Sequence, residues 1–390
     1  MPTLMSINNY YYRRGGADIV FLEQNRLLAK SGWSVVPFSM QHTRNLDTPW
    51  SRYFVKEIEF GEPYSMWEKI VRVQKAVYSF EARRKLERLL DSVRPDVSHS
   101  HNIYHHISPA ILGVLKRHGV PTVITLHDLK LLCPAYSMIT HDGICERCKN
   151  GKLYNVLIHR CMKGSPALSG IVMVESCLHR LIGSYEHNVD RFVVPSRFYR
   201  EKMEEWGWDC GRFVHIPNFV DMVSYRPDFS VGKAFLYFGR LSPEKGLVTL
   251  VRAAAMAKVP VWIAGTGPQE PSLRKLAETA GADVTFLGYL TGDTLHNAVR
   301  SARATVLPSE WYENAPISVM ESYALGTPVI GAAIGGIPEL VRERETGLTF
   351  QSGSVESLAA AMRRFKDMPN EQLAEMGRYG RAWVESDYTA

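Results

Sequence analysis

Two cationic side chains share one loop in the second half of the chain. Arg240 and Lys245 follow the short apolar run at 235–238, and a helical pattern begins directly after them. A guanidinium, an ammonium and the amides of a helix N-terminus can together hold a diphosphate without a divalent metal. Two solvated cations in a loop would leave the same pattern, so this spacing alone does not separate a diphosphate site from an ordinary surface loop.

A second loop, Ser309 to Pro316, carries acidic groups after another apolar run. Pro316 is a favourable first residue for the helix that we expect to continue to Leu325. Glu313 precedes this helix and Glu321 lies about two turns inside it, so the two carboxylates would reach different parts of one ligand. Carboxylates at such positions also cap and solvate ordinary helices, and the spacing does not decide between the two roles.

The first half offers a glycine pair and a histidine at the ends of expected strands. Gly15 and Gly16 sit where a strand turns into a helix, so backbone amides there could approach a phosphate, although turns also use glycine for its positive φ. His127 follows the apolar run at 122–126 and could hydrogen-bond a ligand, but a lone histidine at a strand end is more often structural. The dinucleotide fingerprint G-x-G-x-x-G is missing here and at 265–267, which argues against a nicotinamide dehydrogenase.

Four cysteines form the pattern C-x11-C-x2-C-x12-C directly after His127: Cys133, Cys145, Cys148 and Cys161. Disulfides are not expected in a reducing cytosol, which leaves four free thiols or a tetrahedral zinc site of four thiolates. Such a zinc ion would be structural, because four protein ligands leave no open position for catalysis. Cys177 and Cys210 are expected to be ordinary buried thiols.

Composition places the chain among globular proteins of two or three domains. It has 390 residues, of which 45% are hydrophobic and 22% charged. Neither a secretory signal nor a membrane-spanning run is evident, so we expect a cytoplasmic protein or one on the inner face of the plasma membrane. Residues 1–205 hold 28 Lys and Arg against 20 Asp and Glu, and the remainder 18 against 20. The first half therefore faces phosphate-bearing ligands, nucleic acid or acidic lipid, unless its cations are simply solvated.

One basic segment has helical spacing of apolar residues. Residues 64–90 carry seven Lys and Arg against three Asp and Glu, with apolar side chains at Met66, Ile70, Val73, Val77 and Phe80. This pattern predicts a basic amphipathic helix, which either packs on the first domain or docks on an anionic membrane surface. A nucleic-acid binder is disfavoured because no aromatic stacking stripe interleaves with the basic residues.

Short apolar runs alternate with helical patterns along the whole chain, which predicts parallel βαβ units. The expected strands are 34–38, 97–100, 122–126 and 192–194 in the first half, and 235–238, 261–264, 284–287, 305–307 and 329–331 in the second. We therefore expect an α/β protein of two doubly wound Rossmann-like domains: 1–214, with a Cys-rich insertion at 133–161, a linker at 215–232, and 233–390. Ligands should bind beyond the carboxyl ends of the strands, in a cleft between the domains.

Several motifs occur together in the order typical of one family. They are Gly15-Gly16, His127-Asp128, Pro217-Asn218-x2-Asp221, Gly239-Arg240-x4-Lys245-Gly246, Gly265-x-Gly267-Pro268, Glu313-x7-Glu321, Gly326-Thr327-Pro328-Val329-Ile330 and Gly335-Gly336-Ile337-Pro338-Glu339. With them the chain resembles the family 4 retaining glycosyltransferases of GT-B fold. The family usually continues into a final helix that crosses back to the first domain, whereas this sequence stops at Ala390.

The resemblance implies a metal-independent, retaining hexosyltransferase of bacterial surface-polysaccharide assembly. Its donor would be a nucleotide diphosphate sugar, UDP- or GDP-linked above all, and its acceptor a saccharide or lipid-linked saccharide. The resemblance assigns the diphosphate to Arg240 and Lys245, phosphate to Gly15 and Gly16, and the ribose to Glu321. It assigns the donor sugar to Glu313 with the amides of Asn314 and Ala315, just before Pro316 at the helix start. His127 would contact the sugar near its reacting carbon, and main chain at Tyr289 and Leu290 would contact the base. No catalytic cofactor is implied.

Two other function classes were weighed. A non-catalytic nucleotide-sugar-binding subunit of a glycosylation complex would keep Arg240 and Lys245, but its expected mark is the loss of Glu313 or His127, and both are present. A GT-B epimerase or sugar phosphorylase would need a different acid-base set or a lysine-bound cofactor, and neither is found in the sequence.

Overall fold

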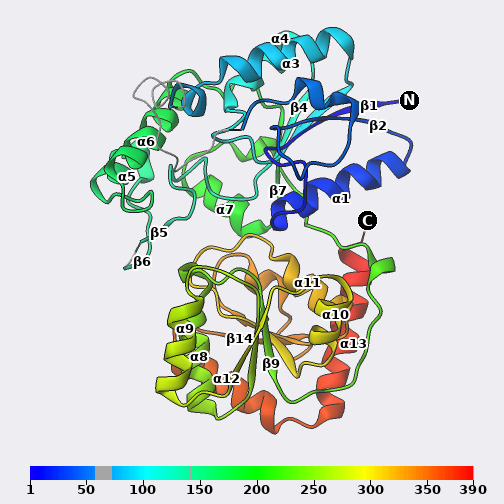
Figure 1. Ribbon diagram of the computed structural model, residues 1–390, viewed down its shortest axis with the longest axis vertical. Helices are drawn as coiled ribbons and strands as arrows, with labels where there is room; N and C mark the ends of the chain where they lie inside the picture. The colour runs from blue at the N-terminus through cyan, green and yellow to red at the C-terminus, as the bar shows by residue number, and fades with distance from the viewer. Residues whose placement is uncertain (58–72, 141, 390) are drawn as a thin grey trace. The chain divides into compact units, whose positions relative to one another are not determined.

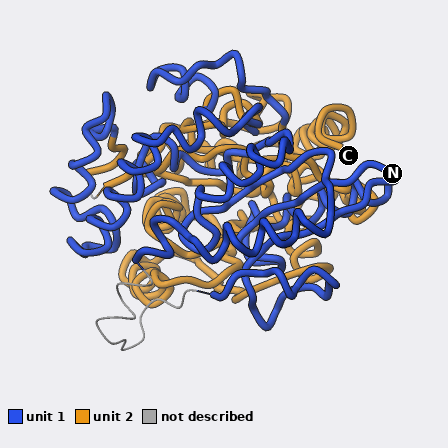
Figure 2. Tube along the Cα trace, turned by 90° about the horizontal axis from the view of Figure 1, so that it is seen from above, with its two compact units in different colours: residues 1–138, 146–195, 199–216 blue, residues 139–145, 196–198, 217–390 orange. Residues whose placement is uncertain are grey.

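The computed structural model of the chain describes residues 1–57, 73–140 and 142–389 (Figure 1). These residues form two compact units, coloured separately in Figure 2. Unit 1 comprises Met1–Met138, Glu146–Pro195 and Tyr199–Ile216, and unit 2 comprises Ile139–Cys145, Ser196–Phe198 and Pro217–Ala390. The main division, between Ile216 and Pro217, lies inside the range 215–232 that the sequence predicts as a linker.

Unit 1 is built on a six-stranded parallel sheet in the order β2-β1-β3-β4-β7-β8. The strands are β1 (Thr3–Ile7), β2 (Ser34–Phe38), β3 (Val97–Ser100), β4 (Thr122–Thr125), β7 (Arg191–Val194) and β8 (Phe213–His215). In register, Met5 of β1 pairs with Val36 on one side and Ser98 on the other. The chain winds outward from β1 to β2 and then returns to β3 on the opposite side, so the strand order reverses between β1 and β3.

The helices of the first part of the chain are α1 (Gly16–Lys30), α3 (Phe80–Ser92), α4 (Leu112–Arg117), α5 (Asn155–Ile158), α6 (Pro166–Leu181) and α7 (Arg197–Glu205). The predicted amphipathic helix over 64–90 falls partly outside the described residues, because 58–72 are not described. Its described part is not one helix: the chain breaks at Tyr78, and the Ser79 hydroxyl caps a new helix by accepting from Ala82 N. The break leaves Val77 buried and Phe80 exposed, which a single amphipathic stripe would not do.

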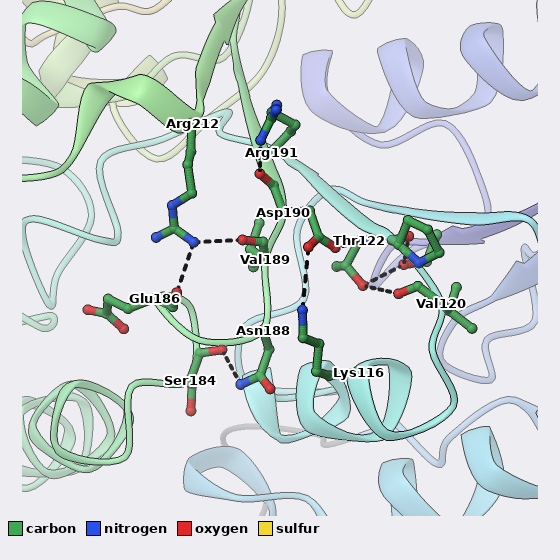
Figure 3. Close-up of polar contacts among 12 residues, drawn as sticks. Lys116, Val120, Thr122, Ser184, Glu186, Asn188, Val189, Asp190, Arg191 and Arg212 are labelled. Carbon is green, nitrogen blue, oxygen red and sulfur yellow. Dashed lines mark hydrogen bonds and ion pairs between the residues drawn. The ribbon is translucent and has the colours of Figure 1, made fainter.

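The connection from α6 to β7 is held by hydrogen bonds to main-chain groups (Figure 3). Arg212 donates to the carbonyls of Glu186 and Val189, each at 2.8 Å. Asp190 accepts from Thr122 N at 2.8 Å and from Lys116 Nζ at 3.5 Å. These contacts fix β7 beside β4, so the loops that follow both strands are positioned by the sheet rather than by their own sequence.

Unit 2 has a second six-stranded parallel sheet, in the order β11-β10-β9-β12-β13-β14. Its strands are β9 (Phe235–Phe238), β10 (Val261–Ala264), β11 (Val284–Gly288), β12 (Ala304–Leu307), β13 (Val329–Ala332) and β14 (Gly347–Phe350). Numbered from its own first strand, this order is 3-2-1-4-5-6, the doubly wound order of dinucleotide-binding domains. The predicted fold class, an α/β protein with two doubly wound Rossmann-like domains, is confirmed.

Helices cover this second sheet: α8 (Leu247–Ala257), α9 (Glu270–Ala280), α10 (Gly292–Arg300), α11 (Ile317–Ala324), α12 (Val355–Asp367) and α13 (Asn370–Asp387). Buried Arg303, just before β12, donates to the carbonyls of Phe365, Lys366 and Met368 at the end of α12. The guanidinium thereby satisfies carbonyls that the helix leaves without partners, and it ties the start of β12 to the end of α12. A short antiparallel hairpin, β5 (Ile139–Thr140) with β6 (Gly143–Ile144), precedes Cys145.

Candidate active site

The loops that follow β9 and β12 carry the predicted anion-binding residues of unit 2. β9 and β12 are neighbours in the sheet, and the strand order reverses between them. Because the carboxyl ends of parallel strands share one edge, this reversal opens a crevice at the point where ligands bind in doubly wound sheets. The structure brings two predicted residues together there: Lys245 Nζ lies 2.6 Å from Glu313 Oε1.

Glu313 is an ionised carboxylate inside protein. Its residue is only 8% exposed, and it accepts from Lys245 and from the Ser309 hydroxyl at 2.7 Å. Burial alone would raise the pKa of this carboxyl, but the Lys245 charge and the hydrogen bonds outweigh burial, so its pKa is lowered. Lys245 Nζ also lies 4.9 Å from the centre of the Trp311 ring, whose face attracts a cation. An entering anion would therefore meet an ammonium already held in place.

Arg240 lies in the same loop but in a more open position. Its side chain is 65% exposed, and its Nη2 lies 2.7 Å from Glu244 Oε1. Its Nε donates to Ser242 Oγ at 3.2 Å. Burial would raise the pKa of Glu244, yet the Ser242 hydrogen bond and the charges of Arg240 and Lys245 lower it. Arg240 is thus oriented along the loop while most of its guanidinium faces solvent, where it can bind a soluble anion.

The backbone that carries Glu313 and Asn314 is pressed against a glycine pair. Gly336 N donates to Glu313 O at 2.8 Å, and a Cβ on Gly336 would lie 1.9 Å from Asn314 O. Gly335 has a φ of +61°, and its added Cβ would lie 2.3 Å from Glu313 O. Only glycine permits this close approach. The sequence singles out this pair through the resemblance alone, because residue types cannot show which backbone the glycines touch.

The helix that follows, α11, places the remaining predicted donor-side groups. Pro316 is the N-cap of α11, so the helix begins at Ile317, and it ends at Ala324, one residue before the predicted end at Leu325. The carbonyl of buried Ala315 accepts from Asn218 Nδ2 at 2.8 Å. Glu321 Oε1 accepts from the Tyr225 hydroxyl at 3.0 Å. Glu321 is therefore anchored on the helix, apart from the Lys245–Glu313 pair.

The remaining residues predicted on the donor side are Asn314, Tyr289 and Leu290. Asn314 Oδ1 accepts from the Ser196 hydroxyl at 2.8 Å. Tyr289, directly after β11, is 75% exposed, whereas Leu290 packs against the small apolar cluster around Leu236. Sequence reasoning missed Ser196 and Ser309. Ser309 could have been found, since it follows a strand in the same loop as Glu313, but Ser196 lies more than a hundred residues away and left no signal.

In unit 1 the predicted glycine pair begins the first helix. Gly15 is the N-cap of α1 in an extended conformation, and its backbone N–H is hydrogen-bonded to the carboxylate of Asp18 in the first turn. A Cβ on Gly15 would come no closer than 3.8 Å to another atom of the protein, so its own surroundings do not require glycine. Asp18 in the first turn accepts from Asn8 Nδ2 at 2.9 Å, and burial raises the pKa of its carboxyl. Gly15 and Gly16 begin α1, which follows β1 beside the reversal point of the sheet.

His127 follows β4 and belongs to a stack of three imidazoles. Its Nε2 lies 2.8 Å from His101 Nδ1, and the two rings are stacked with centroids 5.1 Å apart. His101 stacks in turn on His99, at 4.6 Å. Burial lowers the pKa of His127 to about 3 and that of His99 to about 4, and it lowers the pKa of His101 as well. All three rings are therefore neutral at pH 7.

Sequence reasoning missed His99 and His101, although a signal was available. They are two residues apart on and just beyond β3, so their side chains share one face of the sheet. β3 and β4 are adjacent, which brings that face beside His127. His101 is buried, and its Nε2 has no hydrogen-bond partner among the described residues. The hydrogen bond to His127 is thus the polar contact that orients the His101 ring.

The predicted metal ligands gather only in part. Cys133, Cys148 and Cys161 contribute to one small core together with Val156 and Val172. Burial raises the pKa of Cys133 to about 11. Across residues 1–57, 73–140 and 142–389, no three His, Cys, Asp or Glu side chains are arranged so that they could hold a metal ion. The prediction for the other two cysteines was wrong: Cys177 is exposed and Cys210 is only partly buried.

Comparison with protein families gives two matches that together span most of the chain. The model described as "Glycosyltransferase Family 4" matches residues 14–223, and that described as "Glycosyl transferases group 1" matches residues 229–383. A mannosyltransferase of Corynebacterium glutamicum, described as GDP-mannose-dependent and acting on a monoacylated phosphatidylinositol monomannoside, is 31% identical over 202 residues. That match covers 45% of this chain and 52% of the relative, so the chain matches about half the length of this enzyme.

Other relatives match over more of their length. An uncharacterised 42.6 kDa protein from the cps region of Klebsiella pneumoniae is 25% identical over 351 residues, which is 85% of either chain. Among solved structures, sucrose-phosphate synthase from Thermosynechococcus elongatus has a TM-score of 0.70 at 20% identity and covers 100% of this chain and 95% of its own. Anabaena HepE, solved with UDP and glucose, has a TM-score of 0.66 at 14% identity, with coverages of 100% and 96%. At these identities the structures establish the shared fold.

Proposed function

The chain belongs to glycosyltransferase family 4, and from that membership we propose that it transfers a hexose from a nucleotide diphosphate sugar to a hydroxyl acceptor, with retention at the anomeric carbon. The observation that carries this proposal is the ion pair between Lys245 and Glu313 at the reversal point of the second sheet, with Arg240 in the same loop. Similar proteins support the donor class, since one is described as GDP-mannose-dependent and another was solved with UDP.

In the proposed mechanism, negative charge develops on the departing diphosphate. Lys245 is already held by Glu313 and Trp311, so little reorganisation is needed before its ammonium meets a phosphate oxygen. Exposed Arg240 and the amides at the start of α11 would add further donors to the same anion. These groups would supply the charge stabilisation that a divalent metal gives in other transferases, which is why we propose a metal-independent reaction.

The donor sugar and the nucleotide would use the neighbouring groups. Glu313 and the amides of Asn314 and Ala315 would bind the sugar, Glu321 the ribose, and main chain at Tyr289 and Leu290 the base. In unit 1, the Gly15 and Gly16 amides would meet phosphate, and neutral His127 would hydrogen-bond the sugar near its reacting carbon. For the substitution itself we propose a front-face, ion-pair-like path rather than a covalent intermediate.

The proposed acceptor is a saccharide or a lipid-linked saccharide of surface-polysaccharide assembly. The similarity to a protein encoded in a Klebsiella cps region supports this setting. No described helix is both long and apolar enough to cross a membrane. We propose a cytoplasmic site of action on the inner face of the plasma membrane, where a peripheral protein would meet such an acceptor.

Donor hydrolysis tests the proposal without knowledge of the acceptor. The purified protein would be incubated with UDP-glucose or with GDP-mannose in EDTA, and the released sugar followed by NMR. We expect slow release from one donor, with the anomeric configuration of the donor in the first product formed, and loss of release in Lys245→Ala. Initial release of the opposite anomer would overturn retention. A protein that binds the donor and releases nothing, even with polysaccharide extracts as acceptor, would instead fit a binding subunit.

A structural zinc ion at the four cysteines is a separate proposal. Three of the thiols share one small core, but the described arrangement does not bring three ligands together, so zinc binding would require the insertion to close around the ion. Elemental analysis of protein purified without chelator should find one zinc per chain, and Cys148→Ser should lower that content. A zinc content far below one ion per chain, together with four cysteines that all react with a thiol reagent, would contradict the proposal.

A further inference from the structure

Helix α6 has its polar and apolar sides reversed relative to an ordinary surface helix. Its buried residues are Ser169, Val172, Glu175 and His179. Its exposed side carries Ala167, Val174, Cys177 and Leu181, with partly exposed Gly170 between them. These exposed positions follow one another at intervals of three and four, so they form a continuous apolar stripe. A helix that only packs on its own domain would turn such a stripe inward.

The buried polar groups of α6 have partners, so the orientation of the helix is fixed. Glu175 accepts from Lys130 Nζ at 2.5 Å, with both side chains almost fully buried. His179 bonds the Val77 carbonyl at 2.8 Å through Nε2 and the Ser184 hydroxyl at 2.7 Å through Nδ1. Rotation of α6 to bury the apolar stripe would break these contacts. It would also separate Glu175 from Lys130 and leave the buried ammonium of Lys130 without its carboxylate partner. The stripe is therefore held toward solvent by the interior of unit 1.

Short helix α5 extends the same apolar surface. α5 packs against α6, and a Cβ added to Gly170 would lie 3.9 Å from Leu157 Cδ1 (Figure 1). Beside this contact Ile158 is 64% exposed, compared with 53% for Val174 and 85% for Leu181. Single exposed apolar side chains are common on proteins, whereas large ones gathered on two packed helices mark an interaction site. We call this surface, made by Ile158, Ala167, Val174, Cys177 and Leu181, the α5–α6 face.

Basic residues lie in the segments that flank α5 and separate it from α6. Residues 147–182 contain six Lys and Arg, and Glu175 is their one acidic residue. Glu175 forms a buried ion pair with Lys130, so it does not neutralise the surface cations. Lys152, Arg160 and Lys163 are exposed, and within the described part of the chain none of them forms an ion pair. An apolar stripe bordered by lysine and arginine is typical of helices that lie in the interface of an anionic membrane.

We propose that the α5–α6 face docks this protein on an anionic lipid surface, with the apolar stripe in the acyl boundary and Lys152, Arg160 and Lys163 at the headgroups. A second copy fits less well, because a two-fold contact through this face would bring the same cations of both copies together. The acyl chains of a lipid form no hydrogen bonds, and the only side-chain donor among the residues of the α5–α6 face is the thiol of Cys177. The face therefore matches lipid in its chemistry. The inference rests on the proposed function for its purpose only, which is access to a lipid-linked acceptor.

Vesicle co-sedimentation tests the inference with the full chain. We expect binding to phosphatidylglycerol vesicles that weakens with salt, and much weaker binding to pure phosphatidylcholine vesicles. Val174→Glu with Leu181→Glu should reduce binding to phosphatidylglycerol by at least about tenfold. Lys152→Glu with Lys163→Glu should reduce it at least as much, since each lysine near an anionic surface contributes roughly fivefold.

Matched variants on unit 2 serve as controls. Val223→Glu places the same charge at a side chain that is 91% exposed, and Lys233→Glu with Lys275→Glu gives the same reversal of two exposed lysines. These controls should bind vesicles within about twofold of the unaltered protein, given the short reach of the surface potential. Circular dichroism and UDP or GDP binding should be unchanged in all variants, which separates a docking defect from misfolding.

Several outcomes would overturn the inference. No binding to phosphatidylglycerol vesicles would do so, as would binding that survives both α5–α6 variants. Concentration-dependent dimerisation without lipid, abolished by Val174→Glu with Leu181→Glu, would show instead that a second copy covers the face. Failure of nucleotide binding in the unaltered protein would count against the proposed function and leave the vesicle result standing on its own.

Discussion

The two units carry different side chains at the point where the strand order of each sheet reverses: charged groups in unit 2 and neutral imidazoles in unit 1. At the reversal point of unit 2, Lys245, Glu313 and Arg240 form a charged site that is partly open to solvent. Near the reversal point of unit 1, His99, His101 and His127 form a stack of neutral rings. The position in a doubly wound sheet therefore predicts where a ligand binds, whereas the residues on the loops decide which part of the ligand is recognised.

The two sites differ in how burial changes the pKa values of their side chains. In unit 2 burial would neutralise Glu313, but an ammonium at 2.6 Å keeps it charged. In unit 1 burial, together with the neighbouring imidazoles, drives the pKa values of His127 and His101 down. A charged site suits a diphosphate and a neutral one suits sugar hydroxyls.

Lys245→Ala should have the largest effect. It removes one donor to the developing diphosphate charge, which we expect to lower kcat/KM by about 10²- to 10³-fold. It also leaves Glu313 buried without its partner, which should cost roughly 3 kcal/mol of unfolding free energy. Steady-state kinetics and chemical denaturation measure the two effects. Arg240→Ala is the matched variant, and because its pair with Glu244 is exposed, its stability should change by less than about 1 kcal/mol. Equal destabilisation by both substitutions would contradict the account.

Acidification should weaken unit 1 before unit 2. His99, His105 and His106 have pKa values of about 4 in the folded protein and His127 of about 3, against an ordinary value of 6.5. Between these values the unfolded chain binds more protons, so stability falls as the pH falls. Each such histidine should cost about 2 kcal/mol between pH 7 and pH 5. Asp128 opposes them, because burial raises its pKa to about 6 and its cost declines as it gains a proton.

The carboxylates of unit 2 behave differently in the same range. The lowered pKa values of Glu313 and Glu244 mean that their contribution is present above the ordinary value of 4.5 and is lost only as the pH falls below it. In unit 2, burial also lowers the pKa of His296, which adds one smaller acid-sensitive group. Hydrogen exchange at pH 7 and pH 5, read by peptide, should show greater loss of protection in unit 1. Uniform loss, or loss in unit 2 first, would break the contrast.

Gly336→Ala tests whether the glycine pair shapes the charged site. The new methyl group would need to displace the Asn314 carbonyl, which lies 1.9 Å from the added Cβ, and we expect a loss of roughly 1 to 3 kcal/mol in stability with weaker donor binding. Gly113→Ala is the control, because its nearest neighbour is the end of the Arg117 side chain at 3.9 Å. Thermal unfolding and calorimetry would measure both variants, and indistinguishable behaviour would show that the backbone here can move freely.

His101→Phe should have the smallest effect on catalysis. It preserves a flat buried ring but removes the hydrogen bond at 2.8 Å that orients His127, so we expect kcat to fall by roughly tenfold with little change in nucleotide affinity. His101→Gln, which can restore a polar contact, should recover part of the loss. A variant with unaltered kcat would mean that His127 is positioned without His101.

Much of this fold follows from sequence patterns because it depends on local periodicity. Short apolar runs predicted the strands at 235–238 and 261–264 with the bounds that the structure has, since buried parallel strands need apolar side chains on both faces. The helix over 64–90 could not be predicted in the same way. Its spacing continues through Ser79, yet the Ser79 hydroxyl offers a cap that starts a new helix, and a local hydrogen bond overrides the longer pattern.

The charged site was easier to foresee than the neutral one. Arg240, Lys245 and Glu313 are few, ionised and placed after strands, so residue type and position already mark them. His101 contacts His127, and Ser196 and Gly336 contact Asn314. These partners are distant in the sequence, so only the order of the strands shows that they lie together. The α5–α6 face could not be predicted from the sequence. An apolar stripe on a helix normally indicates the side that packs in the core, and only the burial of each residue in the structure shows that this stripe faces solvent.

Calorimetric binding of UDP, GDP and ADP in EDTA tests the division between a charged and a neutral site most directly. The measurement would use the unaltered protein, Lys245→Ala and His127→Ala. The account predicts that one nucleotide binds without a divalent metal, that Lys245→Ala weakens this binding by more than about tenfold, and that His127→Ala leaves it nearly unchanged. Binding that needs a metal, or that is lost with His127 and kept without Lys245, would contradict it.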